Sequence, residues 1–242
     1  MKISVAQTRP VKAGIQTNID NHKRLIDLAV SNGADIIIFP ELSLTGYEPK
    51  LSKELAINQG DNRFDIFQNI SDARRITIGV GAPIKNNGGI SISMILFQPH
   101  KERQLYSKKY LHPDEEEFFI SGQNSAGLIN NKPNIALAIC YELSVPEHSE
   151  NAFKSGAEIY IASVAKTVDG IKKAAKSLAG IASKYSMTVL MSNSVGLCDD
   201  GECAGKTSIW NNEGLLAAQL NDTNEGILII DTETRELIEK TI

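Results

Sequence analysis

The stretch Asp35-Ile36-Ile37-Ile38-Phe39-Pro40-Glu41 decides the fold class of this 242-residue chain. Its continuous apolar run, rich in β-branched side chains, is typical of a strand buried within a sheet. Pro40 ends the strand because proline has no N–H to donate to the sheet ladder. A second apolar run, residues 134–139, ends at Cys140 in the same way. The two runs predict buried strands with a reactive side chain just after each.

The rest of the chain alternates strand and helix patterns. Strands are expected at residues 2–7, 77–82, 90–97, 104–107, 158–163, 187–193, 206–210, 215–219 and 227–231, and helices at 17–32, 63–75, 146–155 and 169–186. Thr17 is expected to cap the first helix and Gly33 to end it. Turn signals at 86–89 and 211–214 indicate hairpins and therefore mixed strand pairing. With no linker or repeat, this alternation predicts a single α/β domain over residues 1–242.

Composition excludes several classes of protein. The chain is 42% hydrophobic and 22% charged, and 25 basic against 29 acidic residues give a net charge of −4. This mild acidity gives no reason to expect nucleic-acid binding. Residues 1–7 indicate a strand and not a signal peptide, and no apolar run approaches the ~20 residues of a membrane span. Three cysteines, an odd number, argue against a disulfide scaffold, so a soluble cytoplasmic protein is expected.

Three reactive side chains follow predicted strands directly: Glu41, Lys108 (after 104–107) and Cys140. Ligands of open α/β sheets bind at the carboxyl ends of strands, so the three are expected to converge. A carboxylate can take the thiol proton, and an ammonium group favours the thiolate and stabilises an oxyanion. This set suits attack on a carbonyl or nitrile carbon through a thioester or thioimidate.

Several segments around these positions resemble one known family. They are residues 39–47 (FPELSLTGY), 106–111 (YSKKYL), 115–122 (EEEFFISG), 139–142 (ICYE) running on to Val145-Pro146-Glu147, and 205–210 (GKTSIW) with Gly214. In this order they resemble the signatures of the nitrilase superfamily, the carbon–nitrogen hydrolases. Two positions depart from the pattern: Tyr110 stands where the family has His, and Ser121 where it has Pro. Both Lys108 and Lys109 fit the lysine motif, with the Leu111 register and the strand end favouring Lys108.

The resemblance implies a four-layer αββα sandwich that pairs across subunits as a homodimer or higher homo-oligomer. It implies Glu41 as general base, Lys108 as stabiliser of the tetrahedral intermediate and Cys140 as nucleophile, with no metal and no cofactor. Glu115 would position Lys108 and the substrate. The N–H of Tyr141 would be a second oxyanion donor, and a helix starting near Cys140 is expected to lower the pKa of the thiol.

Other pocket candidates have alternatives that stay open. Tyr47, like Phe119, either lines the pocket or packs in the core, and Glu142 is either a structural hydrogen-bond acceptor or a substrate contact. Ala165, Lys166 and Asn193 lie at the ends of two further predicted strands. Lys166 is either a cation for a substrate carboxylate or a surface lysine.

The sequence gives weaker support to two other kinds of site, a metal site and a papain-like catalytic set. Cys198 and Cys203 flank the acidic segment 199–202, but two thiols without a partner histidine indicate loop cysteines more than a metal site. A papain-like set of Cys140, His148 and Asn193 lacks that family's local signature around the cysteine.

The function expected is hydrolysis of a small amide of the ω-amide or N-carbamoyl type, through a cysteine thioester, with release of ammonia or an amine. Nitrilases and aliphatic amidases carry extra C-terminal sequence, which favours a small amidase. Nitrile hydrolysis, acyl or amidino transfer by the same chemistry, and a non-catalytic scaffold of the same fold are the alternatives.

Overall fold

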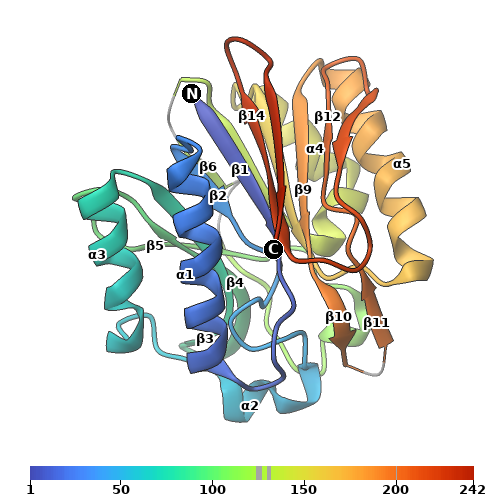
Figure 1. Ribbon diagram of the computed structural model, residues 1–242. Helices are drawn as coiled ribbons and strands as arrows, with labels where there is room; N and C mark the ends of the chain where they lie inside the picture. Colours follow the sequence, from blue (N-terminus) through green and yellow to red (C-terminus); the bar gives the residue numbers. More distant parts are fainter. Residues whose placement is uncertain (124–126, 130–131, 200) are drawn as a thin grey trace.

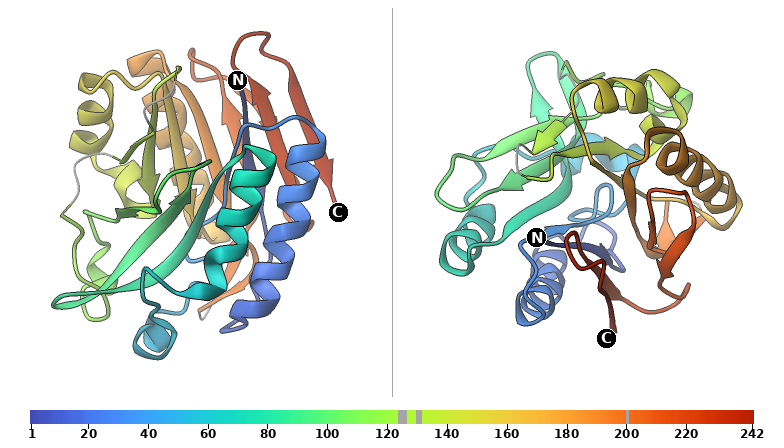
Figure 2. Two further views of the ribbon diagram at one scale, coloured as in Figure 1. Left: turned by 90° about the vertical axis from the view of Figure 1, so that its left-hand side faces the viewer. Right: turned by 90° about the horizontal axis from the view of Figure 1, so that it is seen from above.

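Two β-sheets lie face to face in the computed structural model, which describes residues 1–123, 127–129, 132–199 and 201–242. The first sheet has the order β15-β14-β1-β2-β3-β4-β5 and the second β13-β12-β9-β8-β7-β6. Helices cover the outer face of each sheet, so that four layers follow one another, helix, sheet, sheet and helix (Figures 1 and 2). The α/β class and the four-layer arrangement predicted above are confirmed.

The strands of the first sheet are β1 (Lys2–Gln7), β2 (Ile36–Ile38), β3 (Thr77–Asn86), β4 (Gly89–Phe97), β5 (Gln104–Ser107), β14 (Gly226–Asp231) and β15 (Leu237–Thr241). β1, β2 and β3 are parallel, while the other neighbours pair antiparallel. Helices α1 (Ile15–Ser31) and α3 (Asp65–Arg74) pack on its outer face, where their apolar side chains join a buried cluster with β2 and β3.

The strands of the second sheet are β6 (Gly127–Ile129), β7 (Ile135–Ile139), β8 (Ile159–Val164), β9 (Thr188–Asn193), β12 (Ser208–Trp210) and β13 (Leu216–Gln219). β7, β8 and β9 are parallel. Helices α4 (Pro146–Lys154) and α5 (Val168–Tyr185) cover its outer face. The main core lies between the two sheets, where apolar side chains of β1, β2 and β4 meet those of β7, β8 and β9.

Short elements occupy the connections. They are the 3₁₀ turns η1 (Pro49–Leu51), η2 (Asn62–Phe64), η3 (Pro113–Glu115) and η4 (Cys140–Ser144), the helix α2 (Ser52–Leu55), and the hairpin β10 (Val195–Cys198) with β11 (Gly201–Ala204). Two of them, η3 and η4, carry predicted site residues.

Two sequence-based details are wrong. Helix α1 begins at Ile15, so Thr17 lies inside it and caps nothing. The side chain of Asn18 instead hydrogen-bonds both backbone groups of Val11 (2.7 and 2.8 Å), which fixes the chain before the helix. Cys198 and Cys203 are not loop residues, because they lie buried on paired strands.

Candidate active site

Glu41 is positioned by a tight turn after β2 that lies against β3. The N–H of Phe39 donates to the Gly79 carbonyl (2.9 Å), and a Cβ on Gly81 would lie 2.4 Å from the backbone nitrogen of Leu42. Only glycine at position 81 allows this approach. From the second sheet, the Ser163 hydroxyl donates to the Phe39 carbonyl (2.8 Å). The turn that carries Glu41 is therefore tied to both sheets.

Lys108 continues the line of β5 past its end. Its N–H donates to the Ile92 carbonyl (2.8 Å), and its own carbonyl accepts from the N–H of Gly122 (2.7 Å). A Cβ on Gly122 would lie 2.3 Å from the Ser107 carbonyl oxygen, so this position also requires glycine. The lysine backbone is thereby fixed on both sides.

The Lys108 ammonium lies fully buried between two carboxylates. It donates to Glu41 Oε1 (2.8 Å) and to Glu115 Oε1 (2.7 Å), and all three side chains are at most 1% exposed. Burial alone would lower the pKa of Lys108, but the charges of Glu41, Cys140 and Glu115 outweigh it and raise that pKa. Lys108 therefore stays a cation at neutral pH. Lys109, in contrast, is exposed and lies over the Tyr110 ring.

Glu115, the last residue of η3, is held by two further donors. Its Oε1 also accepts from the Tyr47 hydroxyl (2.9 Å) and its Oε2 from the N–H of His112 (2.8 Å). Burial first, then the charges of Glu41 and Glu115, raises the pKa of Tyr47, so the hydroxyl keeps its proton and remains a donor. Tyr47 thus fixes the carboxylate that fixes Lys108.

Glu41 has one oxygen free of hydrogen bonds. Oε1 accepts from Lys108, while Oε2 is buried without a partner among the described residues. Burial raises the pKa of Glu41, and Lys108 opposes the shift. A buried carboxylate oxygen without a donor is a ready proton acceptor.

Cys140 starts the turn η4 at the carboxyl end of β7 and has a positive φ of 45°. Its side chain is buried, and the charges of Glu41, Lys166, Lys108 and Glu115 all act on its thiol. Burial first, then Glu41, raises the pKa of Cys140 to about 11. The start of η4 at Cys140 does not give a net lowering of this pKa, because desolvation raises it.

The buried side chain of Glu142 hydrogen-bonds residues next to Lys108 and Cys140. Its two oxygens accept from the Tyr106 hydroxyl (2.5 Å) and from the N–H groups of Ile139 (2.8 Å) and Lys109 (2.7 Å). Both oxygens are occupied by protein donors, which supports the structural alternative for Glu142. Phe119 likewise packs in the core between the sheets.

The ends of β8 and β9 place the other candidates. Asn193 is fully buried. Its side-chain amide hydrogen-bonds backbone groups of Lys166 and Gly205 (2.6–3.2 Å), so it is engaged by the backbone and not by the thiol. Lys166 is partly buried and not fully exposed, and the Cys140 thiol is near enough to raise the pKa of its ammonium. Ala165, beside it, is partly exposed. Sequence position indicated these strand ends, but it did not indicate which side chains turn toward the thiol.

The papain-like set is not assembled. The ring nitrogens of His148 are engaged by the hydroxyls of Tyr106 (2.9 Å) and Tyr160 (2.8 Å). The amide of Asn193 is bound elsewhere, as described above. Neither group is available to Cys140.

The described part of the chain contains no cluster of three or more metal-binding side chains. The segment between Cys198 and Cys203 includes Asp200, which lies outside the described residues. Over the same described part, no helix has the length and apolar character needed to cross a membrane.

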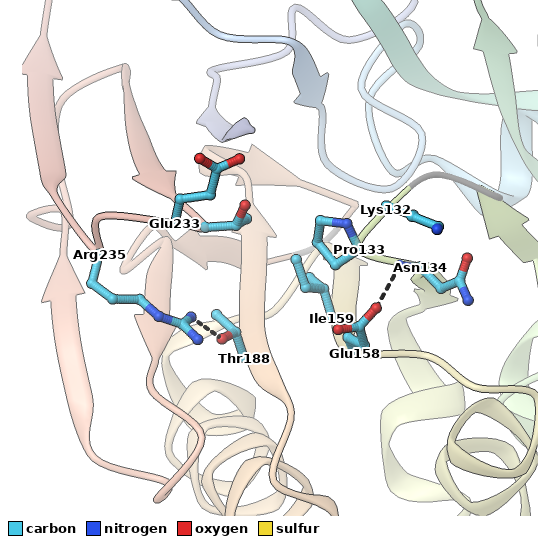
Figure 3. A pocket seen from close by; sticks show the side chains of 9 residues that line it. Lys132, Pro133, Asn134, Glu158, Ile159, Thr188, Glu233 and Arg235 are labelled. Atoms are coloured by element: carbon cyan, nitrogen blue, oxygen red, sulfur yellow. Dashed lines mark hydrogen bonds between the residues drawn. The ribbon is translucent and has the colours of Figure 1, made fainter.

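A cavity of about 470 Å³ lies at the opposite ends of the parallel strands (Figure 3). Asn134, Ile159 and Thr188, at the amino ends of β7, β8 and β9, line it together with Arg235, which donates to Thr188 (3.0 Å). Because Cys140 follows the carboxyl end of β7, this cavity is separate from the candidate active site.

Comparison with known proteins agrees with this geometry. The "Hydrolase in agr operon" of Staphylococcus aureus is 25% identical over 246 residues, covering 98% of this chain and 93% of that protein. An "(R)-stereoselective amidase" of Pseudomonas sp. is 24% identical over an alignment that covers 69% of this chain and 61% of that protein. The amidase of Nesterenkonia sp. AN1, solved in complex with butyramide, has the same fold, with a TM-score of 0.87, 21% identity, and coverage of 97% of this chain and 92% of that one.

The protein family described as "Carbon-nitrogen hydrolase" matches residues 2–240, nearly the whole chain. The fold, the buried Glu41–Lys108 pair and the buried Cys140 agree with that match. The chain belongs to the carbon–nitrogen hydrolase family, the nitrilase superfamily.

Proposed function

We propose that the protein hydrolyses the carbon–nitrogen bond of a small amide, of the ω-amide or N-carbamoyl type, through a thioester on Cys140. The observation that carries this proposal is the buried Lys108 ammonium between Glu41 and Glu115, with Glu41 Oε2 unpartnered. A base, a fixed cation and a thiol, here at the ends of β2, β5 and β7, are what acyl transfer to sulfur requires.

The contacts support the following roles for the proposed reaction. Glu41 takes the Cys140 proton as the sulfur attacks the amide carbon, and it returns that proton to the departing amine. Lys108, with the N–H of Tyr141 at the start of η4, stabilises the oxyanion. Water then attacks the thioester, with Glu41 again as base, and releases the acid. Glu115 and Tyr47 act by holding Lys108 in place.

Two features support the substrate class. Cys140 is only 8% exposed, which suits a short acyl group. A second ammonium, that of Lys166, lies beside the thiol and supports amides that carry a carboxylate, such as ω-amides and carbamoyl amino acids. The similar amidase of Nesterenkonia binds the neutral amide butyramide, so neutral amides belong in the same test.

The test is ammonia release from a panel of butyramide, ω-amides of dicarboxylic acids, carbamoyl amino acids and nitriles. We expect turnover of at least one amide by the wild-type protein and none by Cys140→Ala. Turnover of nitriles alone would replace the amidase proposal with nitrile hydrolysis, and an added amine that outcompetes water would replace it with acyl transfer. Failure of every substrate together with an unlabelled Cys140 would support the scaffold alternative.

We also propose that residues 1–242 act as one catalytic domain in a homodimer or larger assembly. Large apolar side chains are exposed on the second helical layer, at Phe153 on α4 and Val168 at the start of α5. Such exposure supports a contact with a second copy. Light scattering coupled to size exclusion tests this proposal, and a monomer would refute it.

A further inference from the structure

Lys166 and Cys140 lie at the same edge of the second sheet. β7 and β8 are parallel neighbours with Ile139 opposite Ser163. Cys140 follows β7 directly, and Lys166 lies two residues beyond Val164, the last residue of β8. The topology therefore delivers both residues to adjoining strand ends.

The backbone of Lys166 is held on both sides. Its N–H donates to Asn193 Oδ1 (2.8 Å), and its carbonyl accepts from the N–H of Ala204 (2.8 Å) and from Asn193 Nδ2 (3.2 Å). The Asn193 amide is itself fixed by the Gly205 carbonyl (2.6 Å). Asn193 of β9 and Ala204 of β11 thus fix the backbone at Lys166, which limits the freedom of its ammonium group.

The side chain of Lys166 is half-buried, and its ammonium and the Cys140 sulfur lie near enough for each to shift the pKa of the other. Its carbon chain passes the first turn of α5, where a Cβ on Gly170 would lie 3.5 Å from Lys166 Cδ. The start of a helix carries partial positive charge and disfavours a cation. Helix stability therefore does not explain this placement, whereas contact with the thiol does.

The charges around the thiol balance only when Lys166 is counted. Lys108 is shared by two carboxyl groups, those of Glu41 and Glu115, so a single ammonium faces two acidic side chains there. Glu41 and Glu115 raise the pKa of Cys140, and Lys166 and Lys108 lower it. The Cys140 charge is in turn the first cause of the raised pKa of Lys166.

We propose that Lys166 is a second cationic residue of the reaction, which pairs with the Cys140 sulfur and stabilises the thiolate. In that step the S–H bond breaks and an O–H bond forms on Glu41 Oε2. The electron pair stays on sulfur, and the ammonium keeps its protons. The inference rests on Cys140 as the proposed nucleophile, but it does not depend on which amide is the substrate.

The test measures alkylation of Cys140 by iodoacetamide, a neutral probe, against pH in the wild type, Lys166→Met and Lys166→Arg. Mass spectrometry of the Cys140 peptide separates this thiol from Cys198 and Cys203. The charge of Cys140 also acts on Tyr47 and Cys203, but burial raises the pKa of Tyr47, and the Cys198 contact together with burial raises that of Cys203. Both therefore stay neutral over the same pH range.

An opposite charge within ~4–6 Å shifts a pKa by about 1–3 units, so Lys166→Met should slow alkylation about tenfold or more below the pKa of the thiol. Lys166→Arg should restore much of the rate because it keeps the charge. Lys173→Met removes an exposed charge on α5 and is the matched control, with an unchanged rate expected. Thermal unfolding of each variant checks that it is folded.

Two results would overturn the proposal. An unchanged pH profile in Lys166→Met, with loss of turnover only for amides that carry a carboxylate, would make Lys166 a substrate-binding residue alone. Equal loss in Lys166→Met and Lys166→Arg would make its role structural. Alkylation needs no turnover, so these outcomes are distinguishable from failure of the proposed hydrolase activity.

Discussion

Replacing Lys108 with Met tests the buried cluster most severely. The methionine fills similar volume but removes the ammonium that donates to both Glu41 and Glu115, which are each at most 1% exposed. Removing one partner of a buried ion pair typically costs about 3–5 kcal/mol, because it leaves an uncompensated charge in the interior. We expect a loss of free energy of unfolding in that range at neutral pH, together with loss of any amidase activity.

The loss should depend on pH, with a sign set by Glu41. Burial raises the pKa of Glu41 and Lys108 opposes that shift, so Lys108→Met raises the pKa further. A carboxyl group whose pKa is higher in the folded state than its unfolded value of about 4.3 stabilises the folded state most at a pH below that unfolded value. This contribution is lost as pH rises through the folded pKa, so the deficit of the variant should be larger at about pH 8 than at about pH 5.

Urea unfolding of Lys108→Met at these two pH values is the assay, with Lys109→Met as the matched control. Lys109 is exposed, and its replacement should change stability by no more than about 0.5 kcal/mol. An equal loss of free energy of unfolding in the two variants would show that the buried ammonium of Lys108 does not stabilise Glu41 and Glu115. A loss in Lys108→Met that does not grow with pH would show the same.

Three further substitutions separate the roles of the acids and the tyrosine. Glu41→Gln keeps an acceptor for Lys108 but removes the base, so ammonia release should fall about 10²–10⁴-fold while thermal unfolding changes little; retained activity would contradict its role. Tyr47→Phe removes one donor to Glu115 and should cost about 0.5–1.5 kcal/mol in urea unfolding, with a modest loss of activity. Glu142→Gln turns an NH₂ group toward hydroxyl and backbone donors and should cost about 1–3 kcal/mol, also measured by urea unfolding; an unchanged stability would argue against its structural role.

The buried strands were the most predictable part of this fold. The apolar runs at 35–39 and 134–139 became β2 and β7 with ends shifted by one residue at most. Continuous β-branched runs leave few alternatives to a strand covered on both faces. Because Glu41 and Cys140 follow these runs directly, their place at the sheet edge was predictable with them.

Exposed and irregular strands were missed. β15 carries Glu239 and Lys240 and is mostly exposed at the edge of its sheet, so its pattern resembles a loop. The β10–β11 hairpin contains glycines and acids that indicate a turn, although Cys198 and Cys203 are buried on it. In both cases pairing with a distant or irregular partner, not local propensity, makes the strand.

The direction of side chains at the strand ends was beyond sequence reasoning. Asn193 and Lys166 both lie near the ends of predicted strands, yet the Asn193 amide binds backbone groups whereas the Lys166 ammonium lies near the thiol. The choice depends on the register of β8 and β9 and on Gly205 and Ala204, which come from a later part of the chain. The raised pKa of Cys140 likewise follows from burial, which no local motif reveals.

The most direct measurement is the mass of the Cys140 peptide after rapid quenching of the protein with an amide that it turns over. We predict an added acyl group on Cys140 that disappears as the amide is consumed, and no turnover in Cys140→Ala. Ammonia release that persists in Cys140→Ala, or turnover with no adduct on this cysteine under any quench time, would contradict it.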